Sequence, residues 1–269
     1  MASHEEGPAA GRPLDAERGR RASAAELRER LPQAPPAYLE GAWENPELGK
    51  EALALLLRNR AAPAALLSRV AGDRRFAMLQ EVRLALVVHP RTPQPLAQSL
   101  ASHLRWKELC EVADDVRVPP PVRRKAEDLL RVRLEELAVG ERIALARRAS
   151  RGVIAALRQD PDGRVLEALL GNPKLLEAEA AALARSGSTP PAALAALSGH
   201  PRWGGRRAVR LALARNARTP VRSALRALEG LSRSDLLRLV RDDEAPRIVR
   251  VVAERTLGAG APGDRTPEG

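Results

Sequence analysis

The 269-residue sequence has few aromatic residues, a single cysteine and four histidines. Aromatic side chains make up 2% of it, so alanine and leucine must supply most of the core, and helices pack these residues better than sheets do. This composition argues against a β-sandwich or barrel. One cysteine forms no intramolecular disulfide, and neither histidine nor cysteine occurs at metal-ligand spacing, so the sequence predicts no metal and no cofactor.

Long apolar runs are also absent, and none approaches the ~18 residues of a membrane span. The first 37 residues mix alanine, proline, glycine and balanced charge, without the basic start and apolar stretch of a signal peptide. With Cys110 as the only thiol, we expect a protein of the reducing cytoplasm. We also expect residues 1–37 to be mostly disordered, with a short helix around Ser23 to Leu31, and residues 258–269 to form a disordered tail.

An internal repeat is the clearest feature that the sequence does contain. When residue 38 is placed on residue 165, an interval of 127, residues 38–130 align with residues 165–257 without a gap, and 31 of the 93 aligned pairs are identical. About one pair in nine would match by chance in so biased a composition. Asn45-Pro46 matches Asn172-Pro173. The sequence therefore predicts an internal duplication, with a first repeat block at residues 38–164 and a second at residues 165–257. We call the distance between equivalent residues the repeat interval.

A shorter period lies inside each block. Asn45-Pro46 and His89-Pro90 are 44 residues apart, and about three such steps fill one block. A unit of roughly 42 residues accommodates two helices with their turns, and apolar residues recur at helical rather than alternating intervals. Because a single hairpin cannot bury its apolar face, neighbouring hairpins must stack. We predict an all-α, right-handed alpha-solenoid of about six helical hairpins.

The third unit of each block carries a recognisable motif. Asp115 and Arg123 recur at the same spacing as Asp242 and Arg250. The motif resembles the HEAT repeat, and the Asn-Pro and Arg-Thr-Pro turns are similar to those of bacterial leucine-rich-repeat-variant and HEAT-like proteins. This resemblance covers residues 38–257 and implies an armadillo-type helical fold. It also implies that these four residues form a structural ladder between repeats rather than a binding site.

Arginine is concentrated in the second block. The chain has 45 basic and 34 acidic residues, a formal net charge of +11, and no acidic residue between Glu179 and Glu229. Arginines in that interval recur every four residues, which places side chains on one face of a helix. The first block has Leu79, Pro95 and Ser99 at three equivalent positions. We predict a binding surface for an acidic protein or for phosphates at Arg202, Arg206, Arg207, Arg210, Arg218, Arg222 and Arg226.

Two further residues are explained by the alignment of the blocks. Trp203 stands among the arginines, but its equivalent Phe76 lacks most of them, so packing explains both aromatic residues. His89 aligns with Asn216, and a turn hydrogen bond suits both residue types, whereas a metal or catalytic role does not. The sequence therefore predicts structural roles for these residues.

Three functional hypotheses stay open. The one that we favour is a non-enzymatic helical-repeat scaffold that binds an acidic protein partner and has no cofactor or small-molecule substrate. The second is sequence-nonspecific binding of a nucleic-acid backbone through the arginines of the second block. The third and most remote is an enzyme. Trp203 followed by Arg206 and Arg207 is similar to HEAT-like DNA glycosylases, which also require an acidic residue and further aromatic residues around a cavity.

Overall fold

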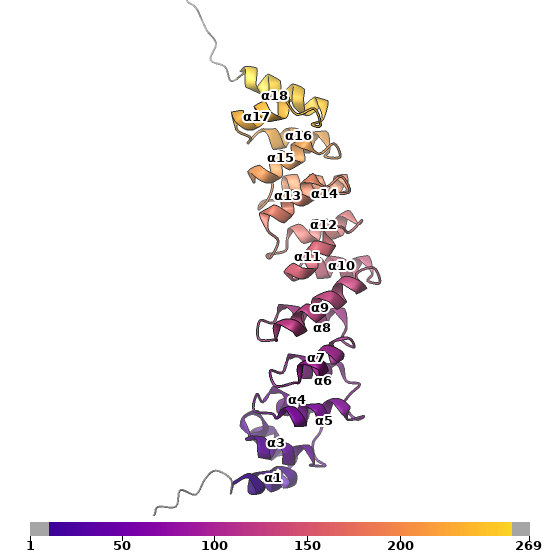
Figure 1. The fold of residues 1–269 in the computed structure, drawn as a ribbon, viewed down its shortest axis with the longest axis vertical. Helices are drawn as coiled ribbons and strands as arrows, with labels where there is room; N and C mark the ends of the chain where they lie inside the picture. The colour runs from indigo at the N-terminus through magenta and orange to yellow at the C-terminus, as the bar shows by residue number, and fades with distance from the viewer. Residues whose placement is uncertain (1–10, 260–269) are drawn as a thin grey trace, which may run out of the picture. The chain divides into compact units, whose positions relative to one another are not determined.

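The structure is a computed structural model that describes residues 11–259. Helices joined by short turns make up this range, and it contains no strand. The chain divides into two compact units, a first unit of residues 1–132 and a second unit of residues 133–269. Figure 1 labels most of their helices along the chain. The all-α fold class is therefore confirmed.

The first unit consists of α-helices and one 3-10 helix. Most of the α-helices have only eight or nine residues, which corresponds to between two and three helical turns. Its elements are α1 (Gly11–Arg21), α2 (Ala24–Arg30), η1 (Leu31–Gln33), α3 (Pro36–Trp43), α4 (Lys50–Arg58), α5 (Ala64–Gly72), α6 (Gln80–Val88), α7 (Gln94–Ala101), α8 (Trp106–Asp114) and α9 (Pro120–Arg133), whose last residue lies past the boundary between the units.

The second unit has the same kind of architecture. Its helices are α10 (Val139–Ala146), α11 (Arg151–Leu157), α12 (Gly163–Leu170), α13 (Glu177–Arg185), α14 (Pro191–Gly199), α15 (Arg207–Arg215), α16 (Val221–Leu228), α17 (Arg233–Val240) and α18 (Arg247–Ala259). Figure 1 shows α12, α14, α16 and α18 following one another on one side of this unit. Each of them contacts the next, as α13 contacts α15, so neighbouring helices make the contacts of a helical repeat.

The helices are shorter than the spacing of the Asn-Pro and His-Pro turns suggested. Pro63 and Pro190 stand immediately before α5 and α14 in extended conformation, because proline fixes φ at a value suited to a helix start and lacks the N–H that would continue an earlier helix. The stretch from Asn45 to His89 therefore contains α4, α5 and α6, three helices instead of two. The predicted hairpin unit of roughly 42 residues is wrong in this respect.

Helix bounds recur at the predicted spacing. Each of the helices α2 to α7 begins and ends one repeat interval before its counterpart among α11 to α16, as Lys50–Arg58 and Glu177–Arg185 illustrate. An internal duplication predicts this recurrence. The recurrence also includes α2 and α11, which lie outside the aligned residues 38–130 and 165–257.

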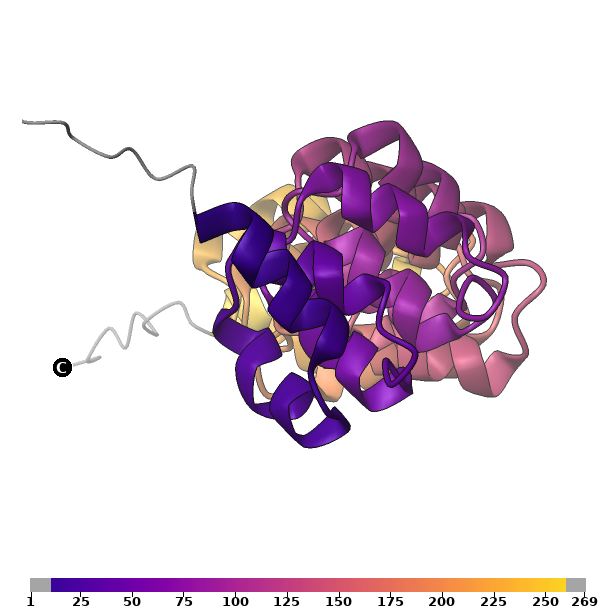
Figure 2. The ribbon, with the colours of Figure 1, turned by 90° about the horizontal axis from the view of Figure 1, so that it is seen from below.

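The expectation of disorder over residues 1–37 is wrong for the part that the structure describes. The short helix near Ser23 is present as α2, but residues 11–21 also form α1. Composition did not predict α1, because this helix has almost no large apolar side chain. Its packing depends on backbone proximity instead, since a Cβ atom on Gly19 would overlap Tyr38 and one on Gly41 would overlap Ala16. Figure 2 shows α1 and its neighbours from the N-terminal end.

Residues 1–10 of the predicted N-terminal segment and residues 260–269 of the predicted tail lie outside the described residues. The first two residues assigned to the tail, 258 and 259, belong to α18.

Buried asparagines connect turns to earlier helices. The Nδ2 of Asn45 donates to the carbonyl oxygens of Gly19 and Ala22 at 3.0 and 2.8 Å. Asn172, the equivalent residue of the second unit, makes the same pair of bonds. Carbonyl groups near a helix end lack helical partners, and these amides supply them, so each turn is fixed to the preceding helices. Leucine and alanine fill most of the core around these turns.

Candidate functional site

Arg202, the first arginine of the predicted surface, takes part in the fold. Its guanidinium donates to the carbonyl oxygens of Asn172 at 3.3 Å and Leu175 at 3.1 Å. The guanidinium carbon also lies 4.2 Å from the centroid of the Trp203 ring, a cation–π distance. Arg202 therefore closes the turn between α12 and α13.

Arg210 and Arg218 also bind backbone carbonyls. The Nε of Arg210 donates to Gly204 at 2.9 Å, and the equivalent Arg83 of the first unit donates in the same way at 2.7 Å. Arg218 donates to Gly187 at 2.9 Å, as Arg91 does to a turn carbonyl at 3.0 Å. Because both units use these arginines alike, their role is structural.

Arg207 has an acidic partner that sequence proximity did not reveal. Its Nε donates to Oδ2 of Asp235 at 2.8 Å, and its Nη2 donates to Oδ1. Asp235 is fully buried and also accepts from the Ser232 hydroxyl at 2.8 Å. The hydrogen bonds from Arg207 hold the pKa of Asp235 at about 2. Asp235 lies beyond the interval without acidic residues, and stacking of α17 near α15 supplies it.

Arg206 is loosely paired. Its Nε lies 3.8 Å from the Glu177 carboxylate and 3.4 Å from the carbonyl oxygen of Arg202. Both charged side chains are exposed, and such a pair contributes little to stability. Arg206 is therefore available to a partner at small cost.

Arg222 and Arg226 remain uncompensated. They are exposed on one face of α16, and neither makes a hydrogen bond or ion pair with another described residue. Together with Leu225 and Glu229 they line a shallow depression of about 460 Å³. Arg222 lies in the first turn of α16, which contains no acidic residue. A helix N-terminus carries partial positive charge, so a cation there is unfavourable unless an anion joins it.

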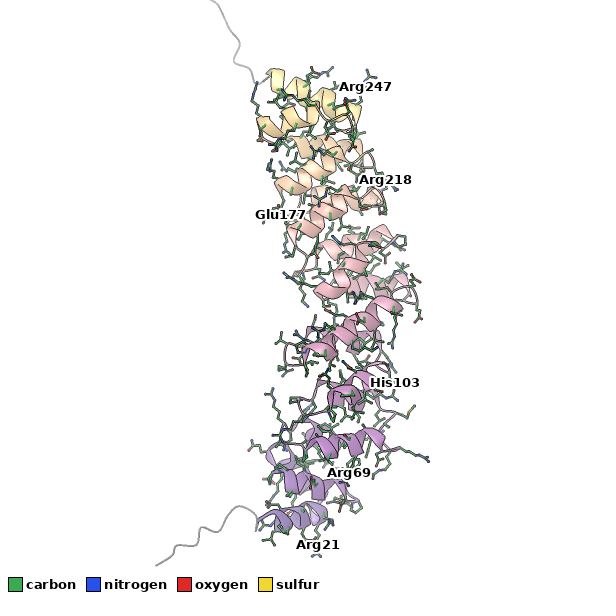
Figure 3. The ribbon with its side chains drawn as sticks, viewed as in Figure 1. Arg21, Arg69, His103, Glu177, Arg218 and Arg247 are labelled. Carbon is green, nitrogen blue, oxygen red and sulfur yellow. The ribbon has the colours of Figure 1, made fainter. Side chains whose placement is uncertain are left out.

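A third exposed arginine, Arg247, lies on α18, a helix that contacts α16. It stands at the start of this helix, and it too lacks a partner among the described residues. Figure 3 shows Arg247 and Arg218 at one edge of the second unit and Glu177 at the opposite edge. We call Arg222, Arg226 and Arg247 the α16–α18 basic surface.

The Asp–Arg ladder expected from the HEAT resemblance does not form with the predicted partners. Asp115 binds Arg117, whose Nε is 2.9 Å from Oδ1, and this bond lowers the pKa of Asp115. The Nε of Arg123 is buried without a hydrogen-bond partner in the described part of the chain. Arg117 is only two residues from Asp115 and binds its carboxylate, and Arg123 makes no hydrogen bond to it.

The second predicted ladder pair is also rearranged. Asp242 pairs with Arg215 on α15, with 2.8 Å between Oδ2 and Nε. Arg250 pairs with Asp243, which is 3.2 Å away and exposed. The aspartates do lie in turns, but the arginines that bind them differ between the two units.

Both predicted structural aromatics are buried. Phe76 lies 6.1 Å from the ring of Trp43, measured between centroids. Trp203 donates its Nε1–H to the carbonyl oxygen of Leu170 at 2.8 Å. These contacts belong to the core and leave neither ring on a binding surface.

His89 makes the turn contacts expected from its alignment with Asn216. Its Nδ1 accepts from the Arg91 N–H at 3.1 Å, so its Nε2 carries the proton that it shares with the Asn59 carbonyl at 3.1 Å. Burial lowers the pKa of His89, which keeps the ring neutral. Asn216 makes the equivalent contacts, accepting from the Arg218 N–H at 2.9 Å and donating its Nδ2 to the Ser186 carbonyl at 3.0 Å, and the structural interpretation of His89 is confirmed.

A groove in the first unit was not predicted. Between the C-terminal ends of α4 and α6 the first unit has a groove of about 480 Å³, with Leu84 and Val88 in its floor and Arg58 and Arg60 at its rim. Cations at helix C-termini are favourable because these ends carry partial negative charge. In the second unit Arg215 replaces Val88 and pairs with an aspartate. The rim arginines are thus explained by helix electrostatics without a ligand.

Among residues 11–259, no group of three or more His, Cys, Asp or Glu side chains could hold a metal ion. No helix in the same range is long and apolar enough to cross a membrane.

Comparison with protein families, with curated proteins and with solved structures finds no match for this chain.

Proposed function

We propose that the chain is a non-enzymatic helical-repeat scaffold of the HEAT-like class that binds an acidic segment of a partner protein through the α16–α18 basic surface. The observation that carries the proposal is the set of three exposed arginines on two contacting helices, none of which makes an ion pair with a described residue. Cys110 is buried, which is compatible with the cytoplasmic location that we also propose.

The first unit supports a functional origin for these charges. Pro95, Ser99 and Pro120 hold the positions equivalent to the three arginines. Helix α7 has the same bounds as α16 relative to the repeat, and it forms without cations at these positions. The architecture does not require the arginines, and two of them, Arg222 and Arg247, oppose the dipole of the helix in which they lie.

The surroundings favour an acidic protein segment over a nucleic-acid backbone. Val221 and Ile248 are 55% and 45% exposed at the starts of α16 and α18, so apolar side chains stand among the cations. A peptide uses both kinds of contact, whereas a phosphate backbone needs many cations. Arg202, Arg207, Arg210 and Arg218 are already engaged within the chain.

Fluorescence anisotropy tests this proposal on the full chain. The probes are a labelled peptide of alternating glutamate and leucine, a mixed-sequence DNA duplex and an RNA of similar length. We expect Arg222→Gln with Arg226→Gln to weaken peptide binding about tenfold, as two rim charges are lost. The matched control is Arg147→Gln with Arg151→Gln, which removes two exposed arginines without described partners from the same unit and should leave affinity unchanged.

Two results would overturn the proposal. Equal weakening by both double variants would mean that net charge alone attracts the peptide. Tighter binding of DNA or RNA than of peptide, lost in the Arg222 and Arg226 variant and steeply salt-dependent, would instead establish the nucleic-acid hypothesis.

A further inference from the structure

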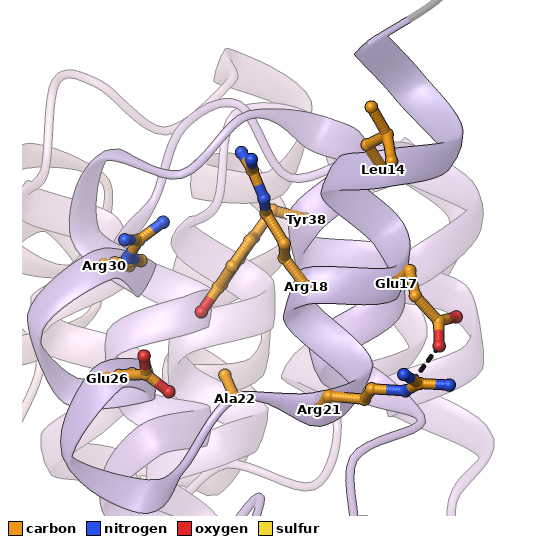
Figure 4. A pocket seen from close by; sticks show the side chains of 8 residues that line it. All are labelled: Leu14, Glu17, Arg18, Arg21, Ala22, Glu26, Arg30 and Tyr38. Carbon is orange, nitrogen blue, oxygen red and sulfur yellow. Dashed lines mark ion pairs between the residues drawn. The ribbon is translucent and has the colours of Figure 1, made fainter.

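A polar pocket lies at the N-terminal end of the first unit. It has a volume of about 560 Å³, within the size range of small-molecule sites. Helices α1, α2 and α3 supply its walls, and Figure 4 shows Arg18, Arg30 and Tyr38 among its lining side chains. The pocket is separate from the α16–α18 basic surface, and no sequence motif predicted it.

Tyr38 has a hydroxyl group without a partner. The residue is 3% exposed, and its Oη is buried and makes no hydrogen bond with any described residue. Burial raises the pKa of Tyr38, so at neutral pH the hydroxyl is an unused donor. A buried polar group without a hydrogen bond costs stability. The pocket therefore contains a donor for which the protein itself provides no acceptor.

The two carboxylates of the pocket are already occupied. Glu17 lies 2.6 Å from the Nε of Arg21. Glu26 accepts from the Ser23 backbone N–H at 2.9 Å and caps α2. These interactions are local to α1 and α2, so neither carboxylate serves the Tyr38 hydroxyl.

The remaining polar groups of the pocket are cations. Arg30 makes no hydrogen bond or ion pair with another described residue, and Arg18 has only a 3.8 Å contact with Asp15. In Figure 4 the hydroxyl end of Tyr38 points towards Arg30 and Glu26, while the side chain of Arg18 crosses that of Tyr38 in this view. The polar side chains of the pocket that make no hydrogen bond or close ion pair are therefore those of Tyr38, Arg18 and Arg30, which are all hydrogen-bond donors.

The second unit fills the same space with aliphatic side chains. The residues at the positions equivalent to Arg18, Glu26, Arg30 and Tyr38 are Leu145, Val153, Leu157 and Val165, all 0% exposed. The same helix arrangement thus packs well without polar groups. Exposure at the end of a helical array explains Arg18, whose side chain is 67% exposed. It does not explain a buried hydroxyl where phenylalanine would pack equally well.

We propose that this pocket binds a small organic carboxylate. Its carboxylate accepts a hydrogen bond from the Tyr38 hydroxyl and forms ion pairs with Arg18 and Arg30, while its apolar body lies against Leu14. The lining has three arginines and two glutamates, so its net charge matches a monoanion rather than a phosphate dianion. The site lies wholly in the first unit and is independent of the α16–α18 basic surface.

Tyr38 reports on its own ligand, because it is the only tyrosine of the chain. The absorbance change of phenol ionisation, followed through an alkaline titration of the full chain, therefore measures the pKa of Tyr38. The probes are benzoate, hexanoate and inorganic phosphate. We expect benzoate or hexanoate to raise the pKa of Tyr38, since a bound anion opposes formation of the phenolate. Phosphate should raise it less.

Two variants separate binding from folding. Tyr38→Phe should weaken carboxylate binding, measured calorimetrically, about tenfold without lowering the Tm, because it removes an unsatisfied hydroxyl. Arg30→Gln should weaken binding to a similar degree. Arg58→Gln, at an exposed arginine of the same unit, should bind as the unmodified chain does. The proposal is overturned if neither carboxylate shifts the Tyr38 pKa at millimolar concentration, or if Tyr38→Phe binds unchanged.

Discussion

The two units share most of their helix bounds but differ in where they place charge. In the second unit α11, α15, α17 and α18 begin with arginine, whereas α2, α6, α8 and α9 begin with alanine, glutamine, tryptophan and proline. Cations at helix N-termini oppose the helix dipole and lower stability. Such residues are not needed for the architecture, because the first unit forms corresponding helices without them. Differences between the units therefore identify candidates for function more directly than composition does.

Features common to both units identify the structural residues. Arg83 and Arg210 bind equivalent turn carbonyls, and the aromatic rings of Phe76 and Trp203 are both buried. A side chain that makes the same contact in both units supports the fold. Arg210 therefore does not belong to the α16–α18 basic surface, although its charge and spacing predicted that it would.

The largest expected effect concerns the close contact of α1 and α3. A Cβ atom on Gly41 would overlap the Ala16 carbonyl, whereas the equivalent residue Ala168 already has a Cβ. Gly41→Ala should therefore lower the free energy of unfolding by about 3 kcal/mol, because backbone cannot yield as a side chain does. Urea denaturation measures the loss, and hydrogen exchange should assign it to α1 and α3.

The reverse change in the second unit is the control for this prediction. Ala168→Gly should cost about 1 kcal/mol, the ordinary effect of glycine inside a helix. Similar losses for both variants would mean that α1 and α3 do not depend on glycine for their contact.

Much of the fold could be predicted from the sequence, because helical periodicity and proline-marked turns are local signals. The length of the helices could not be predicted, since the spacing of Asn45 and His89 fits either two long or three short helices. The repeat before residue 38 was missed because few residues there match the second unit. One signal was present: Arg20-Arg21-Ala22-Ser23 recurs as Arg147-Arg148-Ala149-Ser150 at the repeat interval.

The candidate site was less predictable than the fold. Spacing placed Arg222 and Arg226 together, and they do lie on one face of α16. It could not find the partner of Arg207, since Asp235 comes from a helix 28 residues further on. Residue spacing also could not reveal which carbonyls Arg202 binds or that the Tyr38 hydroxyl lacks a partner, because both depend on how the helices stack.

An intermediate effect is expected from the ion pair between the exposed Arg207 and the buried Asp235. Asp235→Asn should lower the free energy of unfolding at pH 7 by about 2 kcal/mol, through loss of a charge-assisted bidentate contact. The folded pKa of Asp235, about 2, is below the ~3.9 of an unfolded aspartate. The contribution is therefore present above about pH 4 and is lost as the pH falls towards 2.

Denaturation of both proteins across this pH range checks the prediction. The difference in unfolding free energy between the unmodified chain and Asp235→Asn should shrink as Asp235 protonates. A difference that stays constant down to pH 2 would contradict it. Glu108→Gln is the matched control, because Glu108 holds the equivalent position in the first unit and has a buried Oε2 without a described partner.

The smallest effect is expected from a substitution that would build the equivalent of the Arg207–Asp235 pair in the first unit. Gln80 and Glu108 stand where the second unit has Arg207 and Asp235, and each has a buried oxygen without a hydrogen-bond donor among the described residues. Gln80→Arg should supply that donor and raise the free energy of unfolding by about 1 kcal/mol at pH 7. A double-mutant cycle with Glu108→Gln measures the coupling. If the gain persists when Glu108 is replaced, the ion pair has not formed, and positions one repeat interval apart are equivalent in backbone but not in side-chain contacts.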